Sequence, residues 1–218
     1  MGNLSENNVG KVLEWTYEKA INGIPGSEPA SVLAESYLKK SKNAEEALSS
    51  LVNYQITKCA TTGFLAGLGG VVTMPVSIPV NIASVMYVQM RMVAAIAHIR
   101  GYDLKDDQVQ TFVYTCLTGQ AASELVKDVG IKVGLKVGEA QIKRIPGEVL
   151  KQINKAVGFR LVTKFGQTGV VNLGKMIPLL GGVIGGSFDA VSTGTIATAA
   201  RSTFKPNDGF ASGPVLVR

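Results

Sequence analysis

Apolar and polar residues alternate with a helical period along most of the chain. No segment keeps the period of two that a half-buried β-strand would show. Asn43 followed by Glu46 resembles a capping box at the start of a helix. The pattern predicts an all-α fold, a compact multi-helix domain, with helices at 9–20, 30–40, 43 onward, 80–100, 103–129, 131–145, 148–165 and from about 189 to 200.

Two apolar segments are interrupted by glycine and proline. The first runs from Cys59 to Met90 without a charged residue. A membrane helix needs about 20 apolar residues, so the segment is long enough, but Pro75 and Pro79 each remove a backbone donor and break a helix. Residues 176–186 show a weaker version of the same pattern. We expect two Gly/Pro-broken apolar helical hairpins, with corners at Gly67, Gly70, Pro75, Pro79, Pro178, Gly182 and Gly186. Each hairpin is compatible with a protein core, a re-entrant membrane hairpin, or a segment that changes between the two.

Positive charge is concentrated in the C-terminal part of the chain. Residues 127–218 contain 13 Lys and Arg against 5 Asp and Glu, whereas the rest is slightly acidic. Such a region favours an anionic partner, and the scarcity of aromatic residues argues against nucleic acid. A solvated helix face is the alternative explanation for these basic residues. The predicted contacts with anionic lipid are Lys132, Lys136, Lys143, Arg144, Lys151 and Lys155.

Glycines recur on one face of the helix expected at 131–145. Gly130, Gly134 and Gly138 follow one another at intervals of four residues, and lysines lie on the opposite face. Close packing of this face against the protein's own core is the favoured interpretation. A seam of small residues between copies, or within a membrane, is the alternative.

Few side chains in the sequence suggest catalysis. His98 is the only histidine, so a zinc site with several histidines is excluded, and the favoured role for His98 is a hydrogen bond to carbonyls near a helix end. Asp189 is the one charged residue between Lys175 and Arg201, and we expect it to pair with Arg91 or Arg160, to cap a helix or to face water. Cys59 and Cys116 have the apolar surroundings of buried free thiols. No phosphate-binding loop or cofactor site is expected.

Several ordered motifs are shared with a known family. They are GLGGVVTMPV at 67–76, YVQMRMVAAIA at 87–97, GYDL at 101–104, NKAVGFRL at 154–161, KFG at 164–166, NLGK at 172–175 and PLLGGVIGGSFD at 178–189. On these motifs the chain resembles the bacterial EcsC protein family from about residue 30 to residue 204. Residues 1–29 are then an N-terminal helix and linker, and 205–218 a flexible tail. The resemblance implies a helical, membrane-associated protein without catalytic activity or cofactor.

The favoured function is therefore interaction at a membrane. We expect a non-enzymatic protein that is peripheral or re-entrant at the cytoplasmic face of the membrane, without a visible signal peptide. Its partners would be anionic lipid or a membrane protein complex, and it could form a homo-oligomer. One alternative is a toxin that oligomerises through glycine-rich helices and permeabilises the bilayer. The least favoured alternative is an enzyme that uses His98, Arg91 and Asp189.

Overall fold

The computed structural model describes residues 6–60, 80–128, 142–165 and 181–206. Within these ranges the chain is helical and has no β-strand, so the predicted all-α fold is confirmed. The elements are α1 (Glu6–Asn22), α2 (Ala30–Lys40), α3 (Ala44–Ala60), α5 (Val80–Ile99), α6 (Asp107–Cys116), the 3₁₀ turn η1 (Gly119–Ala121), α7 (Ala122–Asp128), α9 (Gly147–Phe165) and α11 (Gly181–Thr203).

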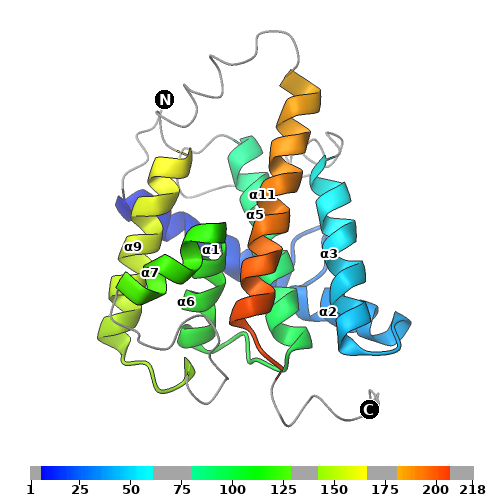
Figure 1. The fold of residues 1–218 in the computed structure, drawn as a ribbon, viewed down its shortest axis with the longest axis horizontal. Coiled ribbons are helices and arrows are strands. Elements are labelled where there is room, and N and C mark those ends of the chain that lie inside the picture. Colours follow the sequence, from blue (N-terminus) through cyan, green and yellow to red (C-terminus); the bar gives the residue numbers. More distant parts are fainter. Residues whose placement is uncertain (1–5, 61–79, 129–141, 166–180, 207–218) are drawn as a thin grey trace.

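Helix α5 is the centre of the bundle. It packs against α1, α2, α3, α6 and α11 (Figure 1). All residues from Met90 to Ala97 are buried, including Arg91. A helix with apolar residues on nearly every side must be surrounded by protein or lipid, and here the other helices surround it.

The predicted capping box at the start of α3 is confirmed. The side-chain oxygen of Asn43 accepts a hydrogen bond from the N–H of Glu46 at 2.9 Å. The Glu46 carboxylate accepts one from the N–H of Lys42 at 2.8 Å. These bonds satisfy donors that the first turn of a helix leaves open, so they define where α3 begins.

The prediction of a single helix at 103–129 is wrong, because the structure divides this region into α6, η1 and α7. Asp103 first forms a turn, in which its carboxylate accepts a hydrogen bond from the N–H of Lys105 at 2.9 Å. After α6, Gly119 adopts a φ of +65°, which other residues rarely take. A Cβ at Gly119 would also lie 3.1 Å from the Oγ1 of Thr195 in α11. Glycine thus permits both the turn and the close approach of α11.

Four helix termini lie together at one end of the molecule. Figure 1 shows that α3 and α9 end there, at Ala60 and Phe165, and that α5 and α11 begin there, at Val80 and Gly181. The helix that precedes each of the segments 61–79 and 166–180 therefore ends here, and the helix that follows each segment begins here. The first of these has no charged residue and the second has only Lys175. We call this the hydrophobic end.

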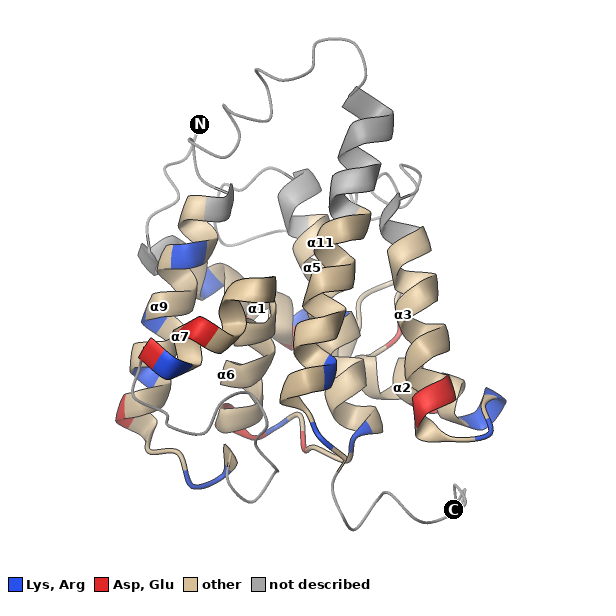
Figure 2. Cartoon of the chain, in the orientation of Figure 1, with Lys and Arg blue, Asp and Glu red and all other residues tan. Residues whose placement is uncertain are grey.

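The opposite end of the bundle is rich in charge. The first turn of α3 and the last turns of α5 and α11 meet there, and they contribute Glu45, Arg100 and Arg201 (Figure 2). The lysines at the end of α2, Lys39 and Lys40, are also exposed there. The bundle therefore has a hydrophobic end and a charged end, at opposite ends of α3, α5 and α11 (Figure 1).

Candidate functional site

Exposed hydrophobic side chains on the described surface are few and unevenly placed. Tyr54 and Phe159 are 52% and 60% exposed and lie in the halves of α3 and α9 nearer the hydrophobic end. Val191 is 68% exposed and lies at the middle of α11. The remaining exposed large hydrophobic residue among those described is Val32, on α2. Two exposed apolar groups thus lie toward the hydrophobic end, and a third lies at the middle of α11. Phe159 lies 180° around the helix from the buried Leu150, so helix periodicity in the sequence could have identified it as an exposed aromatic residue.

The basic residues predicted to contact lipid are only partly described. Lys132 and Lys136 lie outside the described residues. Lys143 and Arg144 are exposed, and the ammonium group of Lys143 is 3.4 Å from the carboxylate of Asp106. Part of the predicted basic surface therefore pairs with acidic groups of the protein itself.

On α9 the basic residues share a face with an aromatic side chain. Lys151, Lys155 and Phe159 follow one another at intervals of four residues and are all exposed, so they lie along one side of the helix. Lys151 forms an ion pair with Glu148 at 3.0 Å, in which both side chains are mostly exposed. Such a pair is weak. This row of residues, which we call the α9 face, leads toward the hydrophobic end (Figure 2).

The predicted hairpin corners are partly outside the described residues. This applies to Gly67, Gly70, Pro75, Pro79 and Pro178. Gly182 and Gly186 are described, and they lie inside α11 instead of at a corner. The prediction of a corner at these two glycines is therefore wrong. No proline lies within α11, so no residue of this helix lacks a backbone donor in the way that Pro178 does.

The two basic residues proposed as partners of Asp189 are directed elsewhere. The guanidinium of Arg160 lies 3.7 Å from the Glu124 carboxylate and 3.6 Å from that of Asp128. Gln89 faces α11, since its amide donates to the Oγ1 of Thr193 at 3.1 Å. Arg91 is two residues further along α5, roughly 200° around the helix, and so points away from α11. The side chain of Asp189 lies outside the described residues.

The alignment of α5 with α11 also places His98 and Asp189, two of the residues of the proposed enzyme site, far apart along the bundle. Helices α5 and α11 run in the same direction (Figure 1), and Gln89 lies level with Thr193. His98 is nine residues after Gln89, whereas Asp189 is four residues before Thr193. At 1.5 Å per residue, His98 and Asp189 are separated by roughly 20 Å along the bundle. This geometry does not bring them into one catalytic site.

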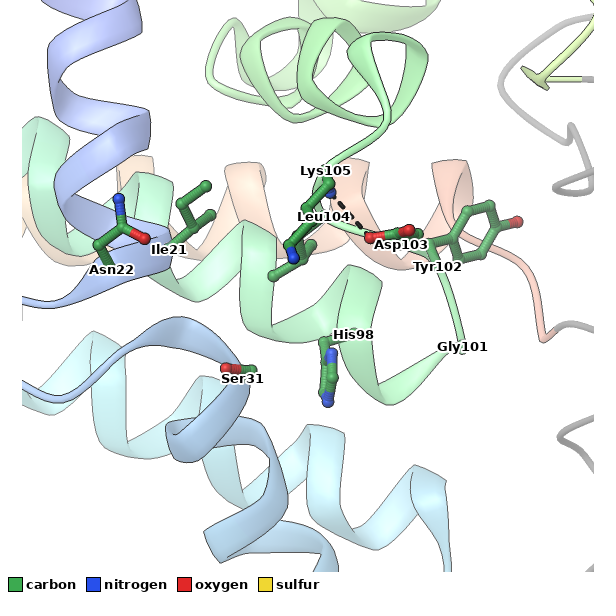
Figure 3. Close-up of a pocket in the computed structure, with 9 residues that line it drawn as sticks. All are labelled: Ile21, Asn22, Ser31, His98, Gly101, Tyr102, Asp103, Leu104 and Lys105. Carbon is green, nitrogen blue, oxygen red and sulfur yellow. Dashed lines mark hydrogen bonds between the residues drawn. The ribbon is translucent and has the colours of Figure 1, made fainter.

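His98 lines a pocket of ≈ 390 Å³ between α1, α2 and the loop that follows α5 (Figure 3). Its ring lies 3.9 Å from the carboxylate of Glu35, instead of against backbone carbonyls as the sequence suggested. Burial lowers the pKa of His98, although Glu35 and Asp103 act in the opposite direction. At the rim, the carboxylate of Asp103 accepts a hydrogen bond from the backbone N–H of Lys105. The described residues include no cluster of His, Cys, Asp and Glu that could hold a metal ion.

Cys116 is a buried free thiol, as predicted. It donates to the Oγ1 of Thr203 at 3.5 Å, and burial raises the pKa of the thiol to about 12. The thiol is therefore protonated near neutral pH and a poor nucleophile. The side chain of Cys59 lies outside the described residues.

An ion-pair network joins three helices at the charged end. One Glu45 carboxylate oxygen is 2.6 Å from the guanidinium of Arg100, and the other is 3.1 Å from that of Arg201. The Arg100 side chain is only 8% exposed. Burial would raise the pKa of Glu45, but the hydrogen bonds and charges of Arg100 and Arg201 outweigh it and hold the pKa below its ordinary value. The network therefore ties α3, α5 and α11 together far from the hydrophobic end.

Replacing Glu45 by glutamine is expected to lower the free energy of unfolding at pH 7 by about 1–2 kcal/mol. Each ion pair of the partly exposed Glu45 contributes little to stability by itself. The substitution, however, leaves the buried guanidinium of Arg100 without a carboxylate partner, which is unfavourable. Because the folded-state pKa of Glu45 is lowered, its stabilisation is present above the ordinary pKa of 4.5 and is lost as pH falls through the lowered value. Urea unfolding at pH 7 and below pH 4 measures both effects, and Glu148→Gln, in an exposed pair, is the control. Equal effects of the two variants at pH 7 would contradict this role for Glu45.

Comparison with known proteins identifies the family of this chain. None of the described helices is both long and apolar enough to cross a membrane. A search of the curated proteins and a search of the solved structures each found no match. The model of the EcsC protein family matches residues 33–206, which include α3 to α11 and most of α2. This match covers most of the sequence and agrees with the ordered motifs, and the chain therefore belongs to the EcsC protein family.

Proposed function

We propose that the protein binds membranes through its hydrophobic end, as a non-enzymatic protein that recognises anionic lipid or supports a membrane complex. The observation that carries this proposal is the grouping of Ala60, Val80, Phe165 and Gly181 at one end of the bundle. A bundle with two long apolar connections at the same end can present both to one flat surface. Connections at opposite ends could not act together in this way.

The exposed side chains near this end suit a membrane interface. Aromatic residues with one apolar and one polar side are favoured at the level of the lipid headgroups, and Tyr54 is such a residue. Phe159 and Val191 add exposed apolar surface on two further helices. Apolar groups arranged around one end of a protein favour binding in the plane of the interface over spanning the bilayer. In this proposal the protein is peripheral or re-entrant at the cytoplasmic face of the membrane.

Lysines of the α9 face add an electrostatic contribution. A basic side chain near an anionic surface contributes about 1 kcal/mol, and salt screens it. We expect Lys151→Gln combined with Lys155→Gln to weaken binding to anionic vesicles on the order of tenfold at low salt, with little effect on neutral vesicles. The matched control is Lys39→Gln with Lys40→Gln, on α2 at the charged end. Equal losses in both double variants would mean that net charge, and not the α9 face, determines binding.

Flotation of the full chain with vesicles tests the proposal as a whole. Vesicles with and without anionic lipid are compared at low and high salt. Binding that persists at high salt supports insertion of apolar groups, and binding that salt abolishes supports contact through basic residues alone. Release of a trapped dye would show that the bilayer is permeabilised. Absence of flotation under all conditions would contradict the proposal.

A further inference from the structure

Arg91 is a buried cation without a partner among the described residues. Its side chain is 7% exposed, and its Nε is buried without a hydrogen bond. No described carboxylate lies within 4.0 Å of its guanidinium, and no described group accepts a hydrogen bond from it. An unpaired charge inside a protein is strongly unfavourable. Its two Nη nitrogens are not among the fully buried atoms without a partner, so an anion can reach them, and a bound anion would account for the buried arginine.

The groups around Arg91 define the chemistry of such an anion. Tyr87 lies one turn earlier on α5, and its hydroxyl donates to the Oγ of Ser27 at 2.9 Å, so it is committed to the protein. Tyr37 on α2 and Tyr54 on α3 lie near enough to the guanidinium to interact with it electrostatically. Glu28 acts on Arg91 only from beyond 4.0 Å. The surroundings thus combine one buried cation with the phenolic hydroxyl of Tyr37, which can donate a hydrogen bond.

We propose that Arg91 and Tyr37 bind a phosphate group. A guanidinium presents parallel N–H donors that match two phosphate oxygens, and the Tyr37 hydroxyl can donate to a third. Tyr54, which also interacts electrostatically with Arg91, is half-exposed on α3. A carboxylate could accept the same hydrogen bonds, but a tetrahedral phosphate offers a separate third oxygen to the Tyr37 hydroxyl. We therefore assign the group as a phosphate monoester or diester.

The position of Arg91 suits the headgroup of a phospholipid, and in this respect the inference rests on the proposed membrane role. Arg91 is eleven residues from the start of α5, roughly 16 Å below the hydrophobic end. Apolar faces of peripheral proteins enter the boundary between headgroups and acyl chains by about 5–10 Å. At the deeper limit roughly 6 Å remains between the lipid boundary and the level of Arg91. Side chains on a helix tilt toward its N-terminus, which for α5 is the hydrophobic end, so the long Arg91 side chain can bridge this distance to a lipid phosphate. A soluble phosphate ester has the same chemistry and is the other source.

The first test is the melting temperature of the full chain with inorganic phosphate, against chloride at equal ionic strength. At about ten times its Kd, phosphate is expected to raise the melting temperature by roughly 3–6 °C. Arg91→Met should abolish this shift, and without phosphate it should melt at the same or a higher temperature, because the variant removes an unpaired buried charge. Tyr37→Phe should reduce the shift while leaving the phosphate-free melting temperature unchanged. Lys11→Met, at an exposed position of α1 that has no part in the proposed binding, is the matched control and should keep the full shift.

Vesicle flotation distinguishes a lipid headgroup from a soluble phosphate ester as the ligand. It also distinguishes failure of the phosphate site from failure of the membrane role. Selective loss of binding to phosphatidylglycerol vesicles in Arg91→Met supports a headgroup, and full competition by glycerol phosphate supports a soluble ester. The inference is overturned if phosphate shifts neither protein and both float equally. It is also overturned if Arg91→Met melts lower without phosphate and Glu28→Gln does the same, because Arg91 would then be a structural partner of Glu28. Failure of the unaltered chain to float, with the phosphate shift intact, would instead contradict only the membrane role.

Discussion

Replacing Phe159 and Val191 together by aspartate is expected to lower partition of the protein into vesicles on the order of 100-fold. Both side chains are more than half exposed on helices that reach the hydrophobic end. Burial of a large apolar side chain contributes about 1.5–3 kcal/mol when complete, and partial burial at an interface about half of that. Each substitution also introduces a negative charge close to anionic lipid. Because neither residue is in the core, the folded state should be kept.

A matched variant distinguishes this end from the rest of the surface. Val32 is also an exposed large hydrophobic residue, but it lies on α2. Val32→Asp should leave vesicle binding within about twofold of the unaltered chain, apart from the small effect of one charge. Circular dichroism and melting temperature establish that all variants fold. An equal loss for Val32→Asp and the double variant would contradict binding through the hydrophobic end.

Replacing Phe204 by alanine is expected to lower the free energy of unfolding by about 3–5 kcal/mol. The ring is fully buried just after α11 and lies edge-to-face against Tyr102, with centroids 5.1 Å apart and planes at 71°. The substitution leaves a cavity and removes an aromatic pair that adds about 0.5–1.5 kcal/mol. Domains are stable by about 5–15 kcal/mol in total. The loss would therefore remove a large part of the stability of the protein.

Urea unfolding monitored by circular dichroism measures this effect. Lys205→Ala, at the next position and partly exposed, is the control and should change stability by less than about 0.5 kcal/mol. The contact between Phe204 and Tyr102 connects the end of α11 to the loop beside His98. A loss below about 1 kcal/mol for Phe204→Ala would show that this connection does not belong to the cooperative core.

Helix periodicity and capping signals were sufficient to predict most helices from the sequence. The bounds of α2 agree with the prediction, and Asn43 marked the start of α3 through a local hydrogen bond. The break between α6 and α7 was missed, although Gly119 was visible. Its left-handed conformation is required by the approach of Thr195, which lies far along the chain. Local pattern cannot show such a constraint.

The partners of the charged side chains could be predicted from the sequence less well than the helices. The partners of Glu45 include Arg201, which is 156 residues away in sequence, and Arg160 pairs with α7 instead of Asp189. The grouping of four helix termini at one end follows from the directions of α3, α5, α9 and α11 in the bundle. The two apolar segments were recognised in the sequence, but their relation in space required the fold.

The most direct test of the membrane role locates the hydrophobic end relative to a bilayer. An environment-sensitive fluorophore is attached to a single cysteine at position 191, or at position 32 as the control, in a chain that lacks Cys59 and Cys116. Vesicles carry a quencher on the lipid acyl chains. The proposed orientation predicts quenching of the label at position 191 and little at position 32. Equal quenching at both positions, or quenching only at position 32, would contradict it.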